Sequence, residues 1–282
     1  MESAKPARAR PFVKWAGGKG QLLKQLHPLF PKKFSTYYEP FLGGGAVFFS
    51  LSPKKAIIND INVTLANTYR QIRSDVDSLI EELKKIEKKF LSAGEDGRRE
   101  FYYKIRDRYN SLPPEDLKRC SLFIFLNRTG FNGMYRENSS GKMNIPFGRN
   151  KNPKILNEEN LRAIAETLHD IEISSNPFEK AVSRAKKDDF VYFDPPYDPI
   201  SSTSSFTAYT GSSFAQEDQI RLRDLFVKLD KKGVFVMLSN SSTPFIKNLY
   251  KNYRQVKVRA SRMINSKTAD RGEIDELVVL NY

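Results

Sequence analysis

The chain has 282 residues, which fits one large α/β domain or one catalytic domain carrying a smaller insertion. Hydrophobic residues make up 39% of it, including 20 Phe and 13 Tyr, so disorder as the main state is excluded. The 47 basic and 33 acidic side chains leave a net charge of +14, which favours nucleic acid as a partner, although a highly charged soluble surface also fits.

Cysteine, histidine and apolar runs restrict the class further. Cys120 stands alone, which excludes a disulfide framework and a cysteine-based zinc site, and two histidines are too few for a typical histidine-rich metal site, so no metal is expected. The longest apolar run, 122–126, is far short of the roughly 20 residues that span a bilayer. No hydrophobic segment of signal-peptide type follows the basic residues of 1–11. We therefore expect a cytoplasmic protein, associated with the nucleoid when bound to DNA, and no membrane partner.

The N-terminal part predicts a strand–turn–helix–strand unit. A β-like run at 36–39 ends in the glycine-containing segment 40–45, and a helix-like run follows at 46–51. A second strand is predicted at 56–59 and ends at Asp60. This order indicates an α/β fold.

The middle of the chain has a different pattern. From 62 to 110 apolar residues recur at helical spacing until Gly94, and a second apolar helix is predicted at 115–127 after two prolines. At 131–149 the helical pattern is lost, and two short runs flank the turn-forming segment 138–141, which predicts a β-hairpin. We interpret this part as an insertion.

The α/β pattern returns after this insertion. A helix is predicted at 157–168, and the unbroken apolar run at 190–193 is typical of a central parallel strand buried on both faces. Ser213 and Gln216 predict a capping box that opens a helix containing Ile220, Leu225, Phe226 and Leu229, and strands are expected at 233–239 and 276–281. The Ser/Thr-rich segment 201–213 has enough aromatic residues to be a lid rather than a linker.

Three glycines follow the first strand. Gly43, Gly44 and Gly45 stand where a nucleotide-type cofactor meets backbone amides in such a sheet, and Asp60 ends the next strand, where it can accept hydrogen bonds from ribose hydroxyls. Phe48 replaces the third glycine of the dinucleotide pattern, which disfavours a nicotinamide cofactor. By themselves the glycines fit a helix-entry turn equally well.

Asp194, Pro195, Pro196 and Tyr197 follow the buried strand, at the edge where α/β sheets place their sites. Proline cannot donate a backbone hydrogen bond, so nearby carbonyls stay available as acceptors. Asp194 and one carbonyl could accept the two N–H groups of an exocyclic amine while Tyr197 stacks on the flat base. The alternative is an Asp-Pro turn that only ends a strand.

Two further segments carry cations beside aromatic residues. Residues 12–19 resemble a phosphate-binding loop, but Val13 occupies its first glycine position and Gly20 its Ser/Thr position, which disfavours an ATPase. The segment 128–154 contains six basic residues and one acidic residue, Glu137. A basic hairpin with aromatic side chains suits a DNA groove, although a solvated loop has the same composition.

Four motifs in order resemble the Dam-type DNA adenine-N6 methyltransferases, which use S-adenosylmethionine. They are Lys-Trp-Ala-Gly-Gly-Lys at 14–19, Glu-Pro-Phe-Leu-Gly-Gly-Gly at 39–45, Asn-Asp-Ile-Asn at 59–62 and Asp-Pro-Pro-Tyr at 194–197. The resemblance implies a Rossmann-like S-adenosylmethionine-dependent methyltransferase sheet with an inserted helical DNA-recognition domain that carries a β-hairpin. The catalytic domain would comprise 1–66 and 158–282, and the target-recognition insert 67–157.

The resemblance also implies roles for individual residues. Asp194, Pro195, Pro196 and Tyr197 would be catalytic, and the cofactor would be bound by Trp15, Lys19, Glu39, Gly43, Gly45, Asp60 and Asp194. Residues 206–209 match the family's active-site loop, and 238–240 match the strand end after it. The segment 175–178 lacks the acidic residue that some relatives use near the cofactor's adenine.

For DNA the resemblance implies a reading surface. Lys14 and Arg136 match the residues that read guanines, and Phe131 matches the aromatic that enters the base stack. The full set of expected DNA contacts is Lys14, Phe131, Asn132, Met134, Arg136, Pro146, Arg149 and Asn150. Met134 stands where relatives have leucine, and Asn150 where some have tyrosine. Of the family's targets we expect 5'-GATC-3', methylated by a monomer on double-stranded DNA, with or without a companion restriction endonuclease.

Two other functions fit part of the sequence. An enzyme of the same fold that methylates RNA or a protein glutamine also suits a carboxylate followed by Pro-Pro-Tyr, although the basic hairpin argues against a protein substrate. A non-enzymatic DNA-binding module explains the net charge but neither the 194–197 motif nor the glycines. The pair of cysteines that a zinc deaminase needs is absent from the sequence.

Overall fold

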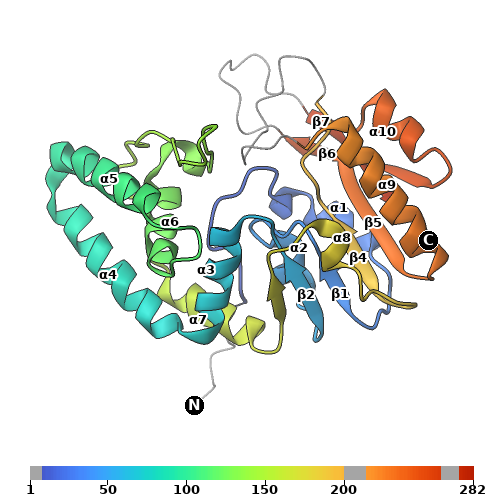
Figure 1. Cartoon of the computed structure of the whole chain (residues 1–282), viewed down its shortest axis with the longest axis horizontal. Coiled ribbons are helices and arrows are strands. Elements are labelled where there is room, and N and C mark those ends of the chain that lie inside the picture. The colour runs from blue at the N-terminus through green and yellow to red at the C-terminus, as the bar shows by residue number, and fades with distance from the viewer. Residues whose placement is uncertain (1–7, 200–213, 262–272) are drawn as a thin grey trace.

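A computed structural model gives the structure of the protein and describes residues 8–199, 214–261 and 273–282 (Figure 1). Three predicted features lie wholly or partly outside these residues: the lid at 201–213, the active-site loop at 206–209 and Ser213 of the predicted capping box.

Within the described residues seven strands form one sheet, in the order β3-β2-β1-β4-β5-β7-β6. Strands β1 to β5 pair in parallel, and β7 is antiparallel to both β5 and β6. The strands are β1 (Tyr37–Glu39), β2 (Ala56–Asn59), β3 (Glu172–Ser174), β4 (Phe190–Phe193), β5 (Phe235–Ser241), β6 (Arg254–Ser261) and β7 (Glu273–Leu280). The Rossmann-like α/β class is confirmed, as are the strands predicted at 36–39, 56–59 and 190–193.

Strand β4 is buried on both faces, and its side chains alternate between two cores. Phe190 and Tyr192 belong to the larger core, which continues into the helical middle of the chain. Val191 and Phe193 belong to the smaller core beneath the helices that follow β3, β4 and β5. Those helices are α8 (Phe178–Ala181), α9 (Gln216–Lys231) and α10 (Pro244–Leu249). An apolar run without alternation is what this double burial requires.

The remaining helices precede β1 or lie between β1 and β3. They are α1 (Leu23–Leu26), α2 (Ala46–Leu51), α3 (Val63–Ser74), α4 (Val76–Ser92), α5 (Gly94–Ser111), α6 (Lys118–Thr129) and α7 (Glu158–Leu168), with short 3-10 turns at Lys19–Gln21, His27–Leu29 and Phe131–Gly133. In Figure 1, α4, α5 and α6 form a lobe beside α3 and α7, on the opposite side of the molecule from β6 and β7. The predicted helical middle is therefore present.

Helix α4 buries one face, as its spacing predicts. Leu79, Ile80, Leu83, Ile86 and Phe90 are all buried, and these positions fall three or four residues apart on one side of the helix. The helix ends where predicted, because Gly94 has a φ of +65°, a backbone conformation that glycine adopts without strain. Helix α6 is buried nearly all round because it packs against α3, α4 and α5 together.

The β-hairpin predicted at 131–149 is only partly right. The two chain segments run antiparallel, but they are joined by two isolated bridges, Gly130 with Phe147 and Glu137 with Met143, and form no ladder. Backbone hydrogen bonds from Asn138 to Lys142 and from Asn144 to Arg136 flank the second bridge, and side chains of α5 bind other backbone groups of the second segment. Asn110 binds both the N–H and the C=O of Met143, at 2.8 and 3.0 Å, and Tyr102 binds the C=O of Ile145 at 2.9 Å. We call residues 130–150 the bridged loop.

The predicted start of α9 is wrong. The helix begins at Gln216 after Ala215, and the carboxylate of Asp218 accepts the N–H of Ala215 at 3.0 Å, so Gln216 is not the capping side chain. Ile220 is exposed, while Phe226 and Leu229 are buried. Across the described ranges, no helix combines the length and apolar character needed to cross a bilayer.

Candidate active site

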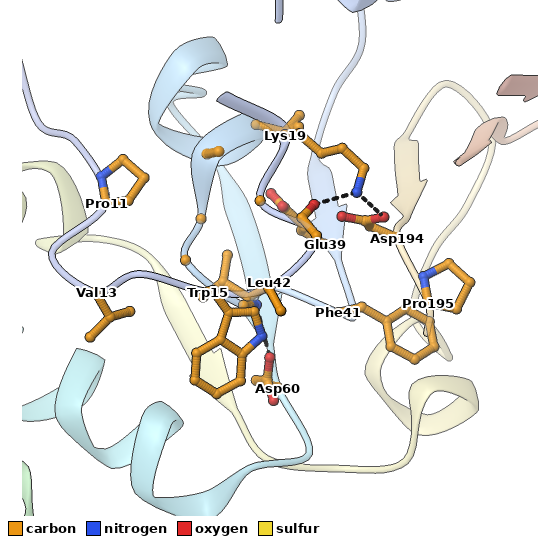
Figure 2. A pocket seen from close by; sticks show the side chains of 18 of the residues that line it. Pro11, Val13, Trp15, Lys19, Glu39, Phe41, Leu42, Asp60, Asp194 and Pro195 are labelled. Carbon is orange, nitrogen blue, oxygen red and sulfur yellow. Dashed lines mark hydrogen bonds and ion pairs between the residues drawn. The ribbon is translucent and has the colours of Figure 1, made fainter. Parts of the chain in front are cut away.

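The candidate site lies where the order of the sheet changes direction. From β1 the chain continues to β2 and β3 on one side, whereas β4 and β5 lie on the other. In such sheets ligands bind at the carboxyl ends of the strands, at this switch point. A cavity of about 360 Å³ lies there, and its lining includes Trp15, Glu39, Asp60 and Asp194 (Figure 2). Four sequence motifs separated by up to 180 residues thus meet at one cavity.

The glycine segment after β1 is held in shape by Asp60. The two carboxylate oxygens of Asp60 accept the N–H of Gly43 at 2.8 Å and the N–H of Asn62 at 2.9 Å. Burial raises the pKa of Asp60 to about 6, and the two N–H donors oppose that rise. Each oxygen keeps a second lone pair, so Asp60 can still accept a hydroxyl hydrogen from a ligand in the cavity.

Position 43 needs a glycine for two reasons: its backbone conformation and the close approach of a neighbouring side chain. Its φ is +50°, and a Cβ at this position would lie 2.5 Å from Cδ1 of Trp15. Trp15 therefore packs directly on the glycine segment, which places its indole at the cavity wall. The other side of the ring system stacks with Tyr135 of the bridged loop, at 5.5 Å between centroids and 19° between planes. The indole thus connects the cavity to the bridged loop.

Lys19 and Asp194 form a buried ion pair. Lys19 Nζ lies 2.7 Å from Asp194 Oδ1, and only 3% of the Lys19 residue is exposed. Figure 2 shows the lysine reaching down to the aspartate at the cavity wall. Burial raises the pKa of Asp194 to about 6, and the ammonium of Lys19 opposes this rise. The lysine therefore helps to keep Asp194 ionised near neutral pH.

Glu39 lies buried on the same wall. Its Oε2 accepts the hydroxyl of Tyr37 at 2.7 Å. Burial raises the pKa of Glu39 to about 8, because desolvation outweighs the hydrogen bond from Tyr37 and the attraction of Lys19. The buried position of Glu39 therefore favours its protonated form.

The segment after β4 is held by residues that the sequence reasoning did not select. The hydroxyl of Tyr197 donates to Oε2 of Glu276 on β7 at 2.6 Å, and Nε2 of Gln219 on α9 donates to the carbonyl of Pro196 at 2.9 Å. Asn240 at the end of β5 donates to Oε1 of Gln219 at 3.0 Å. The ammonium of Lys19 lies 4.8 Å from the centroid of the Tyr197 ring. Glu276 and Gln219 were missed because no local pattern marks them.

The residues expected to contact DNA lie in the bridged loop, apart from Lys14. Asn127 of α6 binds the backbone of Lys14 and of Gly133, and the Lys14 stem lies against Gly133. The N–H of Phe131 donates to the carbonyl of Pro146 at 2.9 Å, so these two residues are adjacent. The exposed members are Lys14, Phe131, Asn132, Arg136, Pro146, Arg149 and Asn150, whereas Met134 is half-buried. Among the described residues no cluster of three or more metal-binding side chains is found.

The sheet order, the glycine segment after β1, the acid after β2 and Asp-Pro-Pro-Tyr after β4 together define a Rossmann-like methyltransferase. Comparison with known families makes this more specific. The chain belongs to the D12 class N6 adenine-specific DNA methyltransferases, whose family model matches residues 15–264.

Individual relatives agree with this family. The chain is 47% identical to a type II methyltransferase of Lactococcus lactis subsp. cremoris, over 97% of its own length and 95% of the relative's. It is 46% identical to a type II methyltransferase of Methanocaldococcus jannaschii, over 97% and 99% of the two chains. The DNA adenine methylase of Escherichia coli is 34% identical over 96% and 95%.

Family membership selects among the functions that the sequence left open. The chain is an adenine-specific DNA methyltransferase, and neither an RNA or protein methyltransferase nor a non-enzymatic DNA-binding module. The family also implies S-adenosylmethionine as the methyl donor.

Proposed function

We propose that this enzyme methylates N6 of an adenine rotated out of double-stranded DNA, within the target 5'-GATC-3'. The observation that carries the proposal is the carboxyl group of Asp194, paired with Lys19 at the cavity wall and followed by Pro195, Pro196 and Tyr197. A carboxylate and a carbonyl beside an aromatic ring can hold the exocyclic amine of a flat base, provided that the base has left the stack.

S-adenosylmethionine fits the cavity. The residues that would hold it are Trp15, Lys19, Glu39, the Gly43–Gly45 segment, Asp60 and Asp194, all of which line the cavity. A ribose suits the carboxylate of Asp60, and the absence of side chains on the glycines leaves room beside the Trp15 indole. When bound, this cofactor supplies a methyl group on a positively charged sulfur, which a nucleophilic amine can attack.

Asp194 acts on the acceptor amine. One N–H of the adenine would donate to its carboxylate and the other to the carbonyl of Pro195, which localises the nitrogen lone pair for attack. The Pro196 carbonyl already accepts from Gln219, and the Tyr197 hydroxyl is fixed by Glu276, so this segment is preorganised. Catalysis is then mainly positioning and electrostatics, and the extra proton of the methylated amine passes to solvent water after the transfer.

The target-recognition insert is 67–157, and together with Lys14 it forms the DNA-reading surface. Lys14 and Arg136 are exposed cations on this surface, and Phe131 is 48% exposed, which is unusual for a phenylalanine. An aromatic ring that enters the base stack would stabilise the gap left by the rotated adenine. The remaining contacts would come from Asn132, Met134, Pro146, Arg149 and Asn150.

The test is methylation of unmethylated plasmid, followed by single-molecule sequencing of modified bases. Methyladenine at GATC sites, present with S-adenosylmethionine and absent without it, is the expected result. Methyladenine at another short motif would refute GATC as the target. It would also refute the assumption that GATC is still recognised when Met134 and Asn150 occupy two positions of the reading surface. The variant Asp194→Ala serves as the inactive control.

We also propose that the enzyme works as a monomer and alongside a restriction endonuclease of the same target. The relatives that are 47% and 46% identical to it are type II methyltransferases, which supports the companion endonuclease. A cell extract from the source strain should cut unmethylated DNA at the mapped site and leave enzyme-treated DNA intact. Extracts that cut neither DNA would indicate a methyltransferase that acts alone. Light scattering coupled to gel filtration measures the monomer mass.

A further inference from the structure

The side chain of Asn127 joins two segments that are distant in the sequence. It is fully buried in α6, and its Oδ1 accepts the N–H of Lys14 at 2.8 Å. Its Nδ2 donates to the carbonyl of Lys14 at 2.8 Å and to the carbonyl of Gly133 at 3.0 Å. Both N–H bonds of the amide are therefore used, one on each segment.

The two segments also touch each other around this amide. Gly133 has a φ of +65°, and a Cβ there would lie 2.3 Å from Cδ of Lys14, so the lysine stem lies directly on the loop backbone. Trp15, one residue after Lys14, stacks with Tyr135, two residues after Gly133. The bridged loop has no β-ladder that could fix its position, because its two halves share only isolated bridges. Side-chain contacts such as these therefore add to the few backbone bonds that hold it, such as the one from the N–H of Gly148 to the carbonyl of Thr129 at 2.9 Å.

We propose that Asn127 is a positioning residue for sequence recognition, which fixes the spacing between the Lys14 ammonium and the Phe131–Arg136 part of the bridged loop. The inference rests on the proposed function, in which Lys14 and Arg136 read base edges. Among the described residues neither cation has an acidic partner; Arg136 Nε donates to Oδ1 of Asn144 at 2.8 Å, which leaves the Lys14 ammonium and the terminal nitrogens of Arg136 for DNA. Base reading depends on hydrogen-bond geometry, so a loosened spacing lowers discrimination before it lowers general DNA affinity.

The chain contains a matched control. Asn160 of α7 is also buried, accepts the N–H of Arg10 at 3.0 Å and donates to the carbonyl of Arg10 at 2.9 Å. It therefore makes the same pair of backbone hydrogen bonds to the same N-terminal segment, four residues before Lys14. No hydrogen bond connects Asn160 to the bridged loop in the described residues. Loss of Asn160 thus costs comparable hydrogen bonds without freeing the reading surface.

The experiment compares the full-length wild type with Asn127→Ala, Asn160→Ala and Lys14→Ala. Initial methylation rates are measured on the mapped target duplex and on duplexes with each single-base change outside the target adenine. Lys14→Ala should relax discrimination at one position. Asn127→Ala should relax the same position on the order of tenfold, the size of one lost base contact, while Asn160→Ala keeps the wild-type ratios. Thermal melting reports the stability of each variant.

A second variant approaches the same contact from the loop. Gly133→Ala forces the backbone away from the Lys14 stem without changing Asn127, and should relax the same position. It keeps the proposal falsifiable if Asn127→Ala does not fold.

Three results overturn the inference. Equal loss of activity in Asn127→Ala and Asn160→Ala with unchanged ratios means that Asn127 only stabilises the fold. Unchanged ratios in a folded Gly133→Ala variant overturn it in the same way. If Lys14→Ala itself leaves every ratio unchanged, Lys14 is not a reader, and that part of the proposed function fails together with the inference.

Discussion

Removing the Lys19 ammonium should move the acidic limb of the pH–activity profile to higher pH. Lys19 Nζ lies 2.7 Å from Asp194 Oδ1, and the lysine is buried. Burial raises the pKa of Asp194 to about 6, and the charge of Lys19 limits that rise. The carboxylate is the form that accepts the amine, so wild-type activity should increase as pH rises through about 6. The variant Lys19→Met keeps the apolar stem and loses the charge.

The size of the effect follows from the ion pair. An opposite charge within about 4–6 Å lowers a carboxyl pKa by roughly 1 to 3, so the midpoint of the limb should rise by about 1 to 3 pH units. For a rise of 2 pH units, about one-tenth of the variant would carry the carboxylate at pH 7. Activity at pH 7 should then fall about tenfold relative to the plateau and recover as the pH is raised.

Single-turnover methylation rates at saturating cofactor, from pH 5 to 9, measure this limb without interference from product release. Lys84→Met is the matched control, because Lys84 also pairs with a carboxylate, Glu158 at 3.1 Å, but on the exposed surface. Its profile should equal that of the wild type. A Lys19→Met loss that is constant from pH 5 to 9 would refute the electrostatic role. An unmoved midpoint would show that Asp194 does not set the limb.

The remaining predictions concern the acceptor, the cofactor and the DNA. Asp194→Ala should lower turnover by about 10³-fold or more while filter binding shows unchanged DNA affinity; a parallel loss of DNA binding would indicate misfolding. Trp15 is the one tryptophan of the chain, so its fluorescence should change on addition of S-adenosylhomocysteine, and Gly43→Ala should weaken that titration at least about tenfold. Phe131→Ala should lower the rate on paired DNA about tenfold but much less when the target adenine is mismatched, because extrusion then costs less. Equal losses on both duplexes would contradict the role of Phe131 in the base stack.

The central strands were predictable because burial on both faces leaves a local signature, and β4 is the clearest case. The edge of the sheet was not. Strand β3 has three residues, of which only Ile173 is buried, so it carries no pattern of its own. Strand β6 begins with Arg254 and carries Lys257, and a polar run of this kind becomes a strand only by pairing with β7. Pairing partners at an edge are set by tertiary structure.

In the bridged loop, the sequence predicts more strand pairing than the structure contains. Its turn residues and flanking runs predict a hairpin, and the chain does reverse there. The two segments, however, pair only at isolated bridges, and Asn110 and Tyr102 of α5 bind the backbone groups of Met143 and Ile145. Only the packed insert brings these side chains to the loop, so local turn chemistry correctly predicted the reversal but not the pairing.

In the candidate site, the motifs were predictable from the sequence, whereas the contacts between them were not. The four motifs that meet at the cavity could be found because each is a compact sequence pattern at the end of a strand. Their contacts could not. The ion pair joins Lys19 and Asp194 across 175 positions, and Glu276 reaches Tyr197 from the last strand. Sequence spacing holds no information on either pair, since both depend on the order of strands in the sheet.

The distribution of charge links the cavity to the reaction. Although the chain carries a net charge of +14, the cavity is lined by the carboxyl groups of Glu39, Asp60 and Asp194 against the single ammonium of Lys19. Burial raises the pKa of all three carboxyl groups, so a cation that enters the cavity gains attraction by restoring their ionised forms. A sulfonium donor is such a cation, and its uncharged thioether product is not. In the proposed site, the same carboxylates that favour binding of the donor would therefore favour the product less, while the outer basic surface would continue to hold DNA.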